Sequence, residues 1–309
     1  MTEIEKILTR EEMAGLKLRA LYYDAGYTQY RMSKFEEYDL YVRNKDFLVS
    51  DSIITFTDTD GRLRALKPDV TLSIIKNTRD TEGLTKLYYN ENVYRVSKGT
   101  HTFREIMQTG VECIGEVDKS TLVEVLTLAI KSLETISPDC VLEISDTDIV
   151  SGIISHLGVS EHARAGILEC LGEKNVIGAR SVLEAEGVGK EGIDMLIGLL
   201  SLHGSPEEVI PKLSAFALDE DTARAVGELT AILDELARLG LSDKTAIDFS
   251  VINNTRYYNG IAFRGFLLGV PTAVLLGGRY DKLMSRMKRT SGAVGFAVYL
   301  DEISRLGGQ

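Results

Sequence analysis

The first hydrophobic pattern in the chain has the period of an α-helix. Apolar residues recur every three or four positions from Met13 to Tyr23. Thr9 and Glu12 stand three residues apart just before this run, in the arrangement of a capping box. Gly26 follows the run and suits a helix end. The pattern therefore predicts an amphipathic first helix between Thr9 and Gly26.

The next segments have a pattern typical of β-strands. Residues 47–57 carry a run of β-branched and aromatic side chains, and 62–66 form a second short run. Between them lies Asp-Thr-Asp-Gly at 58–61, and this arrangement predicts a β-hairpin. Pro68 ends the second strand, and residues 70–77 are expected to form a short helix.

Residues 86–115 are predicted to form a strand, a loop and a strand, because β-favouring side chains flank the small and polar residues 97–102. Gln108 and Glu112 lie four positions apart on the second strand, which places both on one face of the sheet. Arg95 lies near the end of the first strand. A basic residue facing an amide and a carboxylate suits a small zwitterionic ligand. A solvated hairpin face with ordinary charges fits this stretch equally well.

The middle of the chain is predicted to be mostly helical. Thr121 and Glu124 are expected to cap a helix that carries an apolar stripe and ends before Pro138. Residues 141–146 alternate as a strand. Between 157 and 242 the segments are short, rich in alanine and leucine, and end in glycine, which predicts a block of helices.

β-Branched and aromatic residues return after this block, so the sheet is expected to resume. We therefore predict an α+β fold, in which an antiparallel sheet is flanked by helices and interrupted by a helical insertion. The predicted core comprises residues 1–156 and 243–309, and the predicted insertion comprises 157–242.

Composition narrows the class of protein. Lys and Arg total 35 against 46 Asp and Glu, and the formal net charge of −11 argues against a broad nucleic-acid surface, which requires clustered cations. Cys113, Cys140 and Cys170 are widely spaced in apolar contexts and are expected to be buried, reduced thiols. The start of the chain has no apolar leader, and no apolar run approaches about 18 residues. We expect a soluble, cytoplasmic protein.

Metal and nucleophilic chemistry find little support. The four histidines are scattered without metal-binding spacing, and the sequence has neither a Walker-type loop nor a GxGxxG motif after a strand. Gly277 and Gly278 could bring the backbone close to a ligand, or form a tight turn between a strand and a helix. Tyr257 and Tyr258 could likewise belong to a simple strand end.

Taken together and in order, several motifs resemble the catalytic domain of histidyl-tRNA synthetases, a class II synthetase fold. The resemblance runs from the first helix to the C-terminus and implies the antiparallel, helix-flanked sheet of that fold. The six motifs are LKPDVT (66–71), YR (94–95), REIMQTGVE (104–112), YYNG (257–260), GGRYDKL (277–283) and AVGFAVYLDE (293–302).

Several positions depart from the synthetase pattern. Ser97 stands where motif 2 carries a glutamate, although the motif 2 arginine is kept as Arg95. Asn253 and Glu302 replace two arginines that neutralise phosphate charge. Because activation of an amino acid by ATP requires fixed cations around the developing charge, these departures imply a chain that does not charge tRNA. Ser33 replaces the proline of motif 1, the segment that forms the dimer interface in class II folds.

The resemblance retains an amino-acid pocket suited to histidine, which needs an anion for its ammonium and polar partners for its imidazole. Arg95 stays as a remnant of the phosphate side. No catalytic residue, metal or cofactor is implied. The residues assigned to the pocket are Asp69, Thr71 and Gln108 for the ammonium, and Glu112, Tyr258 and Tyr280 for the imidazole.

A synthetase-like chain with this pocket and a dismantled ATP site resembles the regulatory subunits of ATP phosphoribosyltransferase. In that family the subunit pairs with a short-form catalytic subunit in a hetero-octamer and mediates feedback by histidine at the first step of histidine biosynthesis. The resemblance implies a homodimeric, non-catalytic chain that takes histidine as its effector and binds neither tRNA nor a membrane. A divergent synthetase, or a synthetase paralogue with another binding role, are the alternatives.

Overall fold

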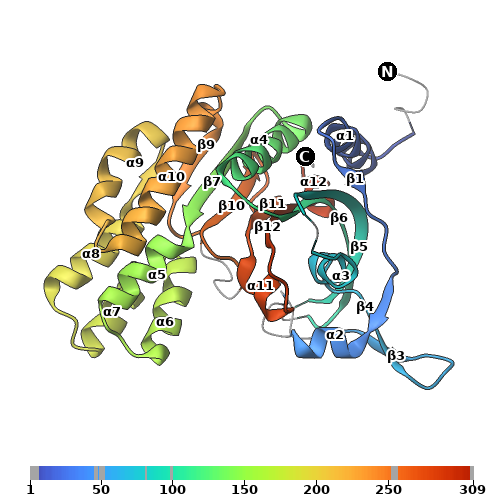
Figure 1. Cartoon of the computed structure of the whole chain (residues 1–309), viewed down its shortest axis with the longest axis horizontal. Helices are drawn as coiled ribbons and strands as arrows, with labels where there is room; N and C mark the ends of the chain where they lie inside the picture. Colours follow the sequence, from blue (N-terminus) through green and yellow to red (C-terminus); the bar gives the residue numbers. More distant parts are fainter. Residues whose placement is uncertain are drawn as a thin grey trace.

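The chain folds around a nine-stranded sheet (Figure 1). The computed structural model describes residues 7–44, 48, 53–80, 82–97, 100–251 and 257–306. The strands of the large sheet are β1 (Thr28–Gln29), β5 (Thr85–Val96), β6 (Phe103–Gly115), β7 (Cys140–Asp146), β8 (His203–Gly204), β9 (Thr245–Asp248), β10 (Ile261–Leu267), β11 (Leu275–Arg279) and β12 (Gly292–Tyr299).

The strand order is β1-β5-β6-β12-β11-β10-β7-β9-β8. Neighbouring strands run antiparallel except at two places, β1 beside β5 and β7 beside β9, where they are parallel. Helices lie on both sides of this sheet (Figure 1). The predicted α+β class is confirmed.

Two separate cores lie on the two faces of the sheet. The larger core contains apolar side chains of α1 (Arg10–Asp24) and α4 (Lys119–Ile136). The smaller core contains side chains of α3 (Thr71–Asn77) and α11 (Asp281–Arg286), together with Ile114 of β6. Because side chains of a strand alternate between faces, Gln108 and Glu112 lie on the face that α3 and α11 cover.

The N-terminal caps of α1 and α4 can be compared with the two predicted capping boxes. The capping box of α1 is confirmed, since Thr9 Oγ1 accepts the Glu12 backbone N–H at 3.2 Å and the Glu12 carboxylate accepts the Thr9 N–H at 2.8 Å. The predicted cap of α4 is wrong. Asp118 caps this helix, because its carboxylate reaches forward to accept the Thr121 N–H at 2.8 Å. The helix ends at Ile136, before the proline, as predicted.

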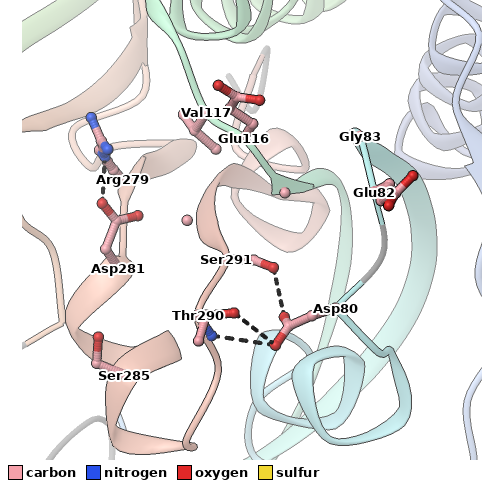
Figure 2. Close-up of a pocket in the computed structure, with 12 residues that line it drawn as sticks. Asp80, Glu82, Gly83, Glu116, Val117, Arg279, Asp281, Ser285, Thr290 and Ser291 are labelled. Atoms are coloured by element: carbon pink, nitrogen blue, oxygen red, sulfur yellow. Dashed lines mark hydrogen bonds and ion pairs between the residues drawn. The ribbon is translucent and has the colours of Figure 1, made fainter.

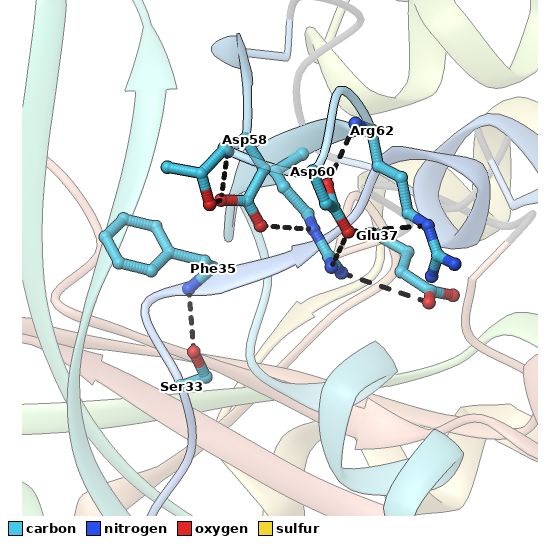
Figure 3. A network of polar contacts seen from close by, with 8 residues as sticks. Ser33, Phe35, Glu37, Asp58, Asp60 and Arg62 are labelled. Atoms are coloured by element: carbon cyan, nitrogen blue, oxygen red, sulfur yellow. Dashed lines mark hydrogen bonds and ion pairs between the residues drawn. The ribbon is translucent and has the colours of Figure 1, made fainter.

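The predicted hairpin is present in its described part. β3 (Thr55–Thr57) and β4 (Leu63–Leu66) are antiparallel, and β2 (Phe35–Glu37) pairs with the other edge of β4. Across the turn, Arg64 Nε donates to the Asp58 carboxylate at 3.2 Å. Figure 3 shows the polar contacts at this turn, among them those of Asp58, Asp60 and Arg62. Residues 47 and 49–52 of the predicted first strand lie outside the described residues.

Five α-helices occupy the predicted helical block, every residue of which the structure describes. α10 packs against α4 and against α5 (Thr147–His156), and its buried Leu229 belongs to the larger core. The helices are confirmed, while the division into a core and an insertion stays a prediction, because one hydrophobic core runs through both. The five helices are α6 (Glu161–Gly172), α7 (Val176–Ala185), α8 (Lys190–Ser201), α9 (Pro206–Leu213) and α10 (Glu220–Arg238).

The last strands differ in detail from the prediction. β9 stops at Asp248, because the chain turns there: the Asp248 carboxylate accepts the Ser250 N–H and the Asp248 carbonyl accepts the Val251 N–H. Gly277 and Gly278 lie inside β11, so the tight-turn interpretation is wrong. After β12 the chain continues into α12 (Leu300–Ile303).

Three further expectations concern chemistry and environment. All three cysteines have free thiols; Cys113 is buried, but Cys140 and Cys170 are partly exposed, at the first residue of β7 and near the end of α6, so that prediction is wrong for these two. No helix in the described part of the chain is long and apolar enough to cross a membrane. Within the same residues, no three His, Cys, Asp or Glu side chains are grouped to hold a metal ion.

Candidate functional site

β5 and β6 bring three of the predicted polar residues to the face of the sheet beneath α3. The side chains of Gln108 and Glu112 are 3% and 2% exposed, and Arg95 is 9% exposed. The interpretation of this hairpin as an ordinary solvated face is therefore wrong at these positions. Buried polar groups require hydrogen-bond partners, from the protein or from a ligand.

Glu112 accepts hydroxyl hydrogen bonds from two segments that are distant in sequence. Thr71, in the first turn of α3, donates from Oγ1 to Glu112 Oε1 at 2.6 Å. Tyr280, just before α11, donates from its hydroxyl to Oε2. Gly295 of β12 is opposite Glu112 in the register, and a Cβ at this position would overlap the carboxylate. The fold thus brings together three of the predicted pocket residues and reserves space for the acid.

Asp69 lies at the start of α3 and is almost completely buried. Its Oδ1 accepts the Leu72 backbone N–H at 2.9 Å, so Asp69 does support the start of this helix. Arg95 is positioned beside the same segment, where its Nε donates to the Pro68 carbonyl at 2.9 Å. A buried carboxyl and a guanidinium therefore border the pocket at its α3 end.

Burial shifts the protonation of both acids. Burial, with a smaller contribution from the nearby Asp69, raises the pKa of Glu112 to about 8, against the lowering effect of the hydrogen bonds from Thr71 and Tyr280. Burial also raises the pKa of Asp69, against the lowering effect of the Leu72 N–H and of Arg95. Two carboxyl groups in this pocket thus share an environment that disfavours negative charge.

Tyrosine rings form one wall of the pocket. The ring centroids of Tyr257 and Tyr258 are 4.8 Å apart, and those of Tyr257 and Tyr280 are 5.7 Å apart. Gly278 of β11 allows this packing, because a Cβ there would be 2.6 Å from the ring of Tyr258. Gly278 therefore admits the ring of Tyr258, and Tyr257 and Tyr258 are part of this wall.

Two structural features of the site were missed from the sequence. Tyr257 packs between Tyr258 and Tyr280, although only the latter two were assigned to the pocket. Lys67 is fully buried, and its Nζ lies 2.6 Å from the Glu91 carboxylate, on a strand that borders the pocket. A lysine inside LKPDVT and a glutamate inside a β-rich run are both typical of surface positions, so no sequence signal marked this pair.

The positions that depart from the synthetase pattern are engaged elsewhere. Glu302 accepts the Thr272 hydroxyl at 2.7 Å and forms an ion pair with Arg305 at 2.7 Å. Ser33 Oγ accepts the Phe35 backbone N–H at 3.1 Å (Figure 3). Asn253 lies outside the described residues.

A groove of about 830 Å³ opens beside this pocket, at the ends of β6 and β11 (Figure 2). Arg279 and Asp281, which flank Tyr280 in the chain, form an ion pair at one wall, and Asp80 accepts hydrogen bonds from Thr290 and Ser291 at the other. The residues that line the groove include none of the predicted pocket residues. The predicted site is thus the buried face beneath α3, and the groove is a separate feature.

A large, mostly antiparallel sheet with helices on both faces, and a cluster of buried polar side chains between the sheet and α3, define a protein with the class II aminoacyl-tRNA synthetase-like fold. Residues 5–303 match the profile of the histidyl-tRNA synthetase family. The chain therefore belongs to the histidyl-tRNA synthetase family.

Named relatives narrow the similarity within this family. The chain is 28% identical to the ATP phosphoribosyltransferase regulatory subunit of Clostridium kluyveri, over 93% of this chain and 75% of that protein. A crystal structure from Bacillus halodurans, described as an ATP phosphoribosyltransferase regulatory subunit/histidyl-tRNA synthetase, is 25% identical, with a TM-score of 0.85 over 100% of this chain and 81% of that one. The resemblance to regulatory subunits is confirmed, and that name denotes a regulatory rather than a catalytic chain.

A third comparison concerns an assembly. The chain shares its fold with one chain of the ATP phosphoribosyl transferase (HisG:HisZ) complex from Thermotoga maritima, at a TM-score of 0.73 over 97% of both chains. The sequence identity is 16%, so this similarity is one of fold.

Proposed function

We propose that this chain is a histidine-sensing, non-catalytic subunit of ATP phosphoribosyltransferase and that histidine binds in the pocket beneath α3. The observation that carries the proposal is that Glu112 and Gln108 lie on one buried face and that no described protein group accepts a hydrogen bond from Gln108 Nε2. A buried amide with an unused donor is costly unless a ligand completes it. The proposed ligand residues are Asp69, Thr71, Gln108, Glu112, Tyr258 and Tyr280.

The chemistry of the pocket suits an amino acid with a basic ring. Asp69 offers a carboxyl group for the ligand ammonium, in a position where Arg95 offsets only part of its charge. Glu112 offers acceptor capacity for an imidazole N–H, since each carboxylate oxygen can accept more than the single hydroxyl bond it receives. Tyr258 and Tyr280 frame the ring.

The relatives' names, and the shared fold with one chain of a HisG:HisZ complex, support an association with the catalytic subunit. We infer that this chain pairs with itself as a homodimer and binds a short-form ATP phosphoribosyltransferase catalytic subunit in a hetero-octamer, in the cytoplasm. Histidine then acts as feedback effector of the first step of histidine biosynthesis. Because a ligand shifts an equilibrium only by its differential affinity, histidine must bind the inhibited assembly more tightly than the active one.

The direct test is co-expression with a short-form catalytic subunit, followed by co-purification and an activity assay with and without histidine. We expect a stable complex, activity that requires this chain, and inhibition by histidine. Failure of the two chains to co-purify would refute the partner, and full activity at saturating histidine would refute the sensing role.

The family match also raises histidine activation as a second candidate, and we expect it to be absent. Ser97 and Glu302 stand where a glutamate and a phosphate-binding arginine would be needed, and Glu302 adds negative charge of its own. Pyrophosphate exchange with histidine and ATP measures this step. Histidine-dependent exchange at the rate of an ordinary synthetase would contradict the proposal.

A further inference from the structure

The carboxyl group of Glu112 is buried without a cation bonded to it. Its oxygens accept hydrogen bonds from the neutral hydroxyls of Thr71 and Tyr280, and no described Lys, Arg or His side chain forms an ion pair with it. Arg95, a basic group on the same face of the sheet, donates to the Pro68 carbonyl and lies at the Asp69 end. A buried carboxylate without a paired cation costs free energy, so such a group usually takes up a proton and becomes neutral.

The titratable groups that face Glu112 from the surrounding elements are acidic or phenolic, apart from Arg95, whose Nε donates to the Pro68 carbonyl. Asp69, at the start of α3, makes ionisation of Glu112 harder, and burial keeps each neighbouring tyrosine in its neutral form. Burial also raises the pKa of the Cys113 thiol, on the reverse face of β6, to about 12. The titratable or charged groups near Glu112 are Asp69 before α3, Tyr89, Glu91 and Arg95 of β5, Cys113 of β6, Tyr257 and Tyr258 before β10, Tyr280 before α11, and Tyr299 of β12.

A ligand in this space is indicated independently by Gln108. This side chain is 3% exposed and lies on the same strand and the same face as Glu112, and its Nε2 donates to no described protein group. The two buried acids, Glu112 and Asp69, and the Gln108 amide with its unused donor therefore form one incomplete polar site.

We propose that the pocket binds histidine as a proton-sharing pair, in which a single proton lies between the Glu112 carboxyl group and the imidazole ring. The inference rests on the proposed function, because it takes histidine as the ligand. At neutral pH the empty pocket supplies the proton as the O–H of Glu112, and the ring enters with one unprotonated nitrogen. The proton either stays on oxygen or moves to that nitrogen, and no other reactant is needed.

The proton shared by Glu112 and the imidazole ring limits the pH range in which histidine binds tightly. The pKa of Glu112 is about 8 in the empty pocket, and the ordinary pKa of an imidazole is about 6.5. Above pH 8 both partners lack the proton, so binding must take one from solvent. Below about pH 6.5 both carry one, so binding must release one. Affinity for histidine is therefore highest between these values and falls up to about tenfold per pH unit on either side.

Calorimetry of the full-length chain with histidine tests this through the number of protons exchanged, measured in buffers of different ionisation enthalpy. At pH 7 we expect an exchange close to zero. At pH 8, where Glu112 is about half ionised, we expect about half a proton more uptake than in Glu112→Gln. Any proton exchange by the ammonium group of histidine is the same for both proteins, so it cancels in the difference. Glu116→Gln, which changes an exposed carboxylate near the end of the same strand, is the matched control and should keep the uptake.

Tyr280→Phe provides a second variant if Glu112→Gln fails to fold. It removes a hydrogen bond that lowers the pKa of Glu112, so uptake at pH 8 should fall below that of the native chain. Release of nearly one proton at pH 7, or equal uptake at pH 8 with and without the Glu112 carboxyl, would overturn the inference while leaving histidine binding intact. Absence of any histidine binding would overturn the proposed function and the proton-sharing pair together.

Discussion

Glu112 combines two demands that oppose each other. The proposed function assigns it to a basic ligand, yet it is buried among neutral hydroxyls. Replacement by glutamine keeps its volume and removes the group that shares a proton with histidine in the proposed pair. We expect Glu112→Gln to weaken histidine binding by roughly 1.5–3 kcal/mol, about tenfold or more, because a hydrogen bond to a charged group is lost.

Activation of the catalytic partner should survive in Glu112→Gln, since it depends on assembly. Calorimetry and a histidine inhibition curve on the reconstituted complex measure the two properties separately. Glu116→Gln should leave both unchanged. If Glu112→Gln is inhibited by histidine as strongly as the native complex, the feedback site lies elsewhere.

The same residue makes stability depend on pH. The pKa of Glu112 is raised from 4.5 to about 8 in the folded chain, so folding takes up a proton between these values. The contribution of Glu112 to stability is therefore greatest at low pH and is lost as pH rises through about 8. Without histidine, Glu112→Gln should gain stability relative to the native chain between pH 5 and pH 8.5.

Urea unfolding of both proteins at pH 5 and pH 8.5 checks this expectation, since other titrating groups cancel in the difference. Glu116→Gln should show no such gain. A difference between Glu112→Gln and the native chain that is constant over this range would mean that Glu112 titrates normally in the folded state.

At the scale of elements, α10 joins the helical region to the sheet. Leu229 on this helix is completely buried in the core that also contains α1, α4 and the strands. We expect Leu229→Ala to destabilise the chain by about 2–5 kcal/mol, because it leaves a cavity in that shared core.

Urea unfolding followed by circular dichroism measures this loss. Unfolding should remain a single transition, because the helices and the sheet share one core. Leu239→Ala, at the exposed end of α10, should change stability by no more than about 0.5 kcal/mol. Two separate transitions in Leu229→Ala would support the helical region as an independently folding unit.

Sequence patterns predicted elements whose cause is local. The capping box of α1, the hairpin at 58–61 and the helices of the 157–242 block depend on neighbours in the chain, and the structure contains them. Features set by distant contacts were missed. Gly277 and Gly278 resemble a turn in sequence, but the rings of Phe263 and Tyr258 require glycine at those strand positions.

In the candidate site, too, locally determined features were predicted and features that depend on distant contacts were missed. The spacing of Gln108 and Glu112 placed both on one face, because strand geometry is local. Their burial could not be read from the spacing, since it depends on α3 and on the segment around Tyr280 folding over that face. The burial of Lys67 with Glu91 has the same origin: it requires two segments that are 24 residues apart.

For the whole molecule, we expect a homodimer. The first helix and the segment after it occupy the position of motif 1, and two-fold pairing is the commonest arrangement of soluble oligomers. Ser33 replaces the motif 1 proline and accepts the Phe35 N–H, a bond that fixes this segment locally. Light scattering of the isolated chain at micromolar concentration should give twice the mass of 34.1 kDa. A mass of one chain would contradict the dimer.

The two-residue strand β8 has a consequence for any attempt to shorten the protein. β8 contributes two residues from the helical region and pairs with β9, and it forms the outermost position of the sheet. Deletion of residues 157–242 would remove this cover and leave the N–H and C=O groups along one side of β9 open. An open strand edge is a template on which other chains pair. The core that remains after this deletion would therefore be prone to aggregation. β8 thus protects the solubility of the sheet by covering the edge of β9.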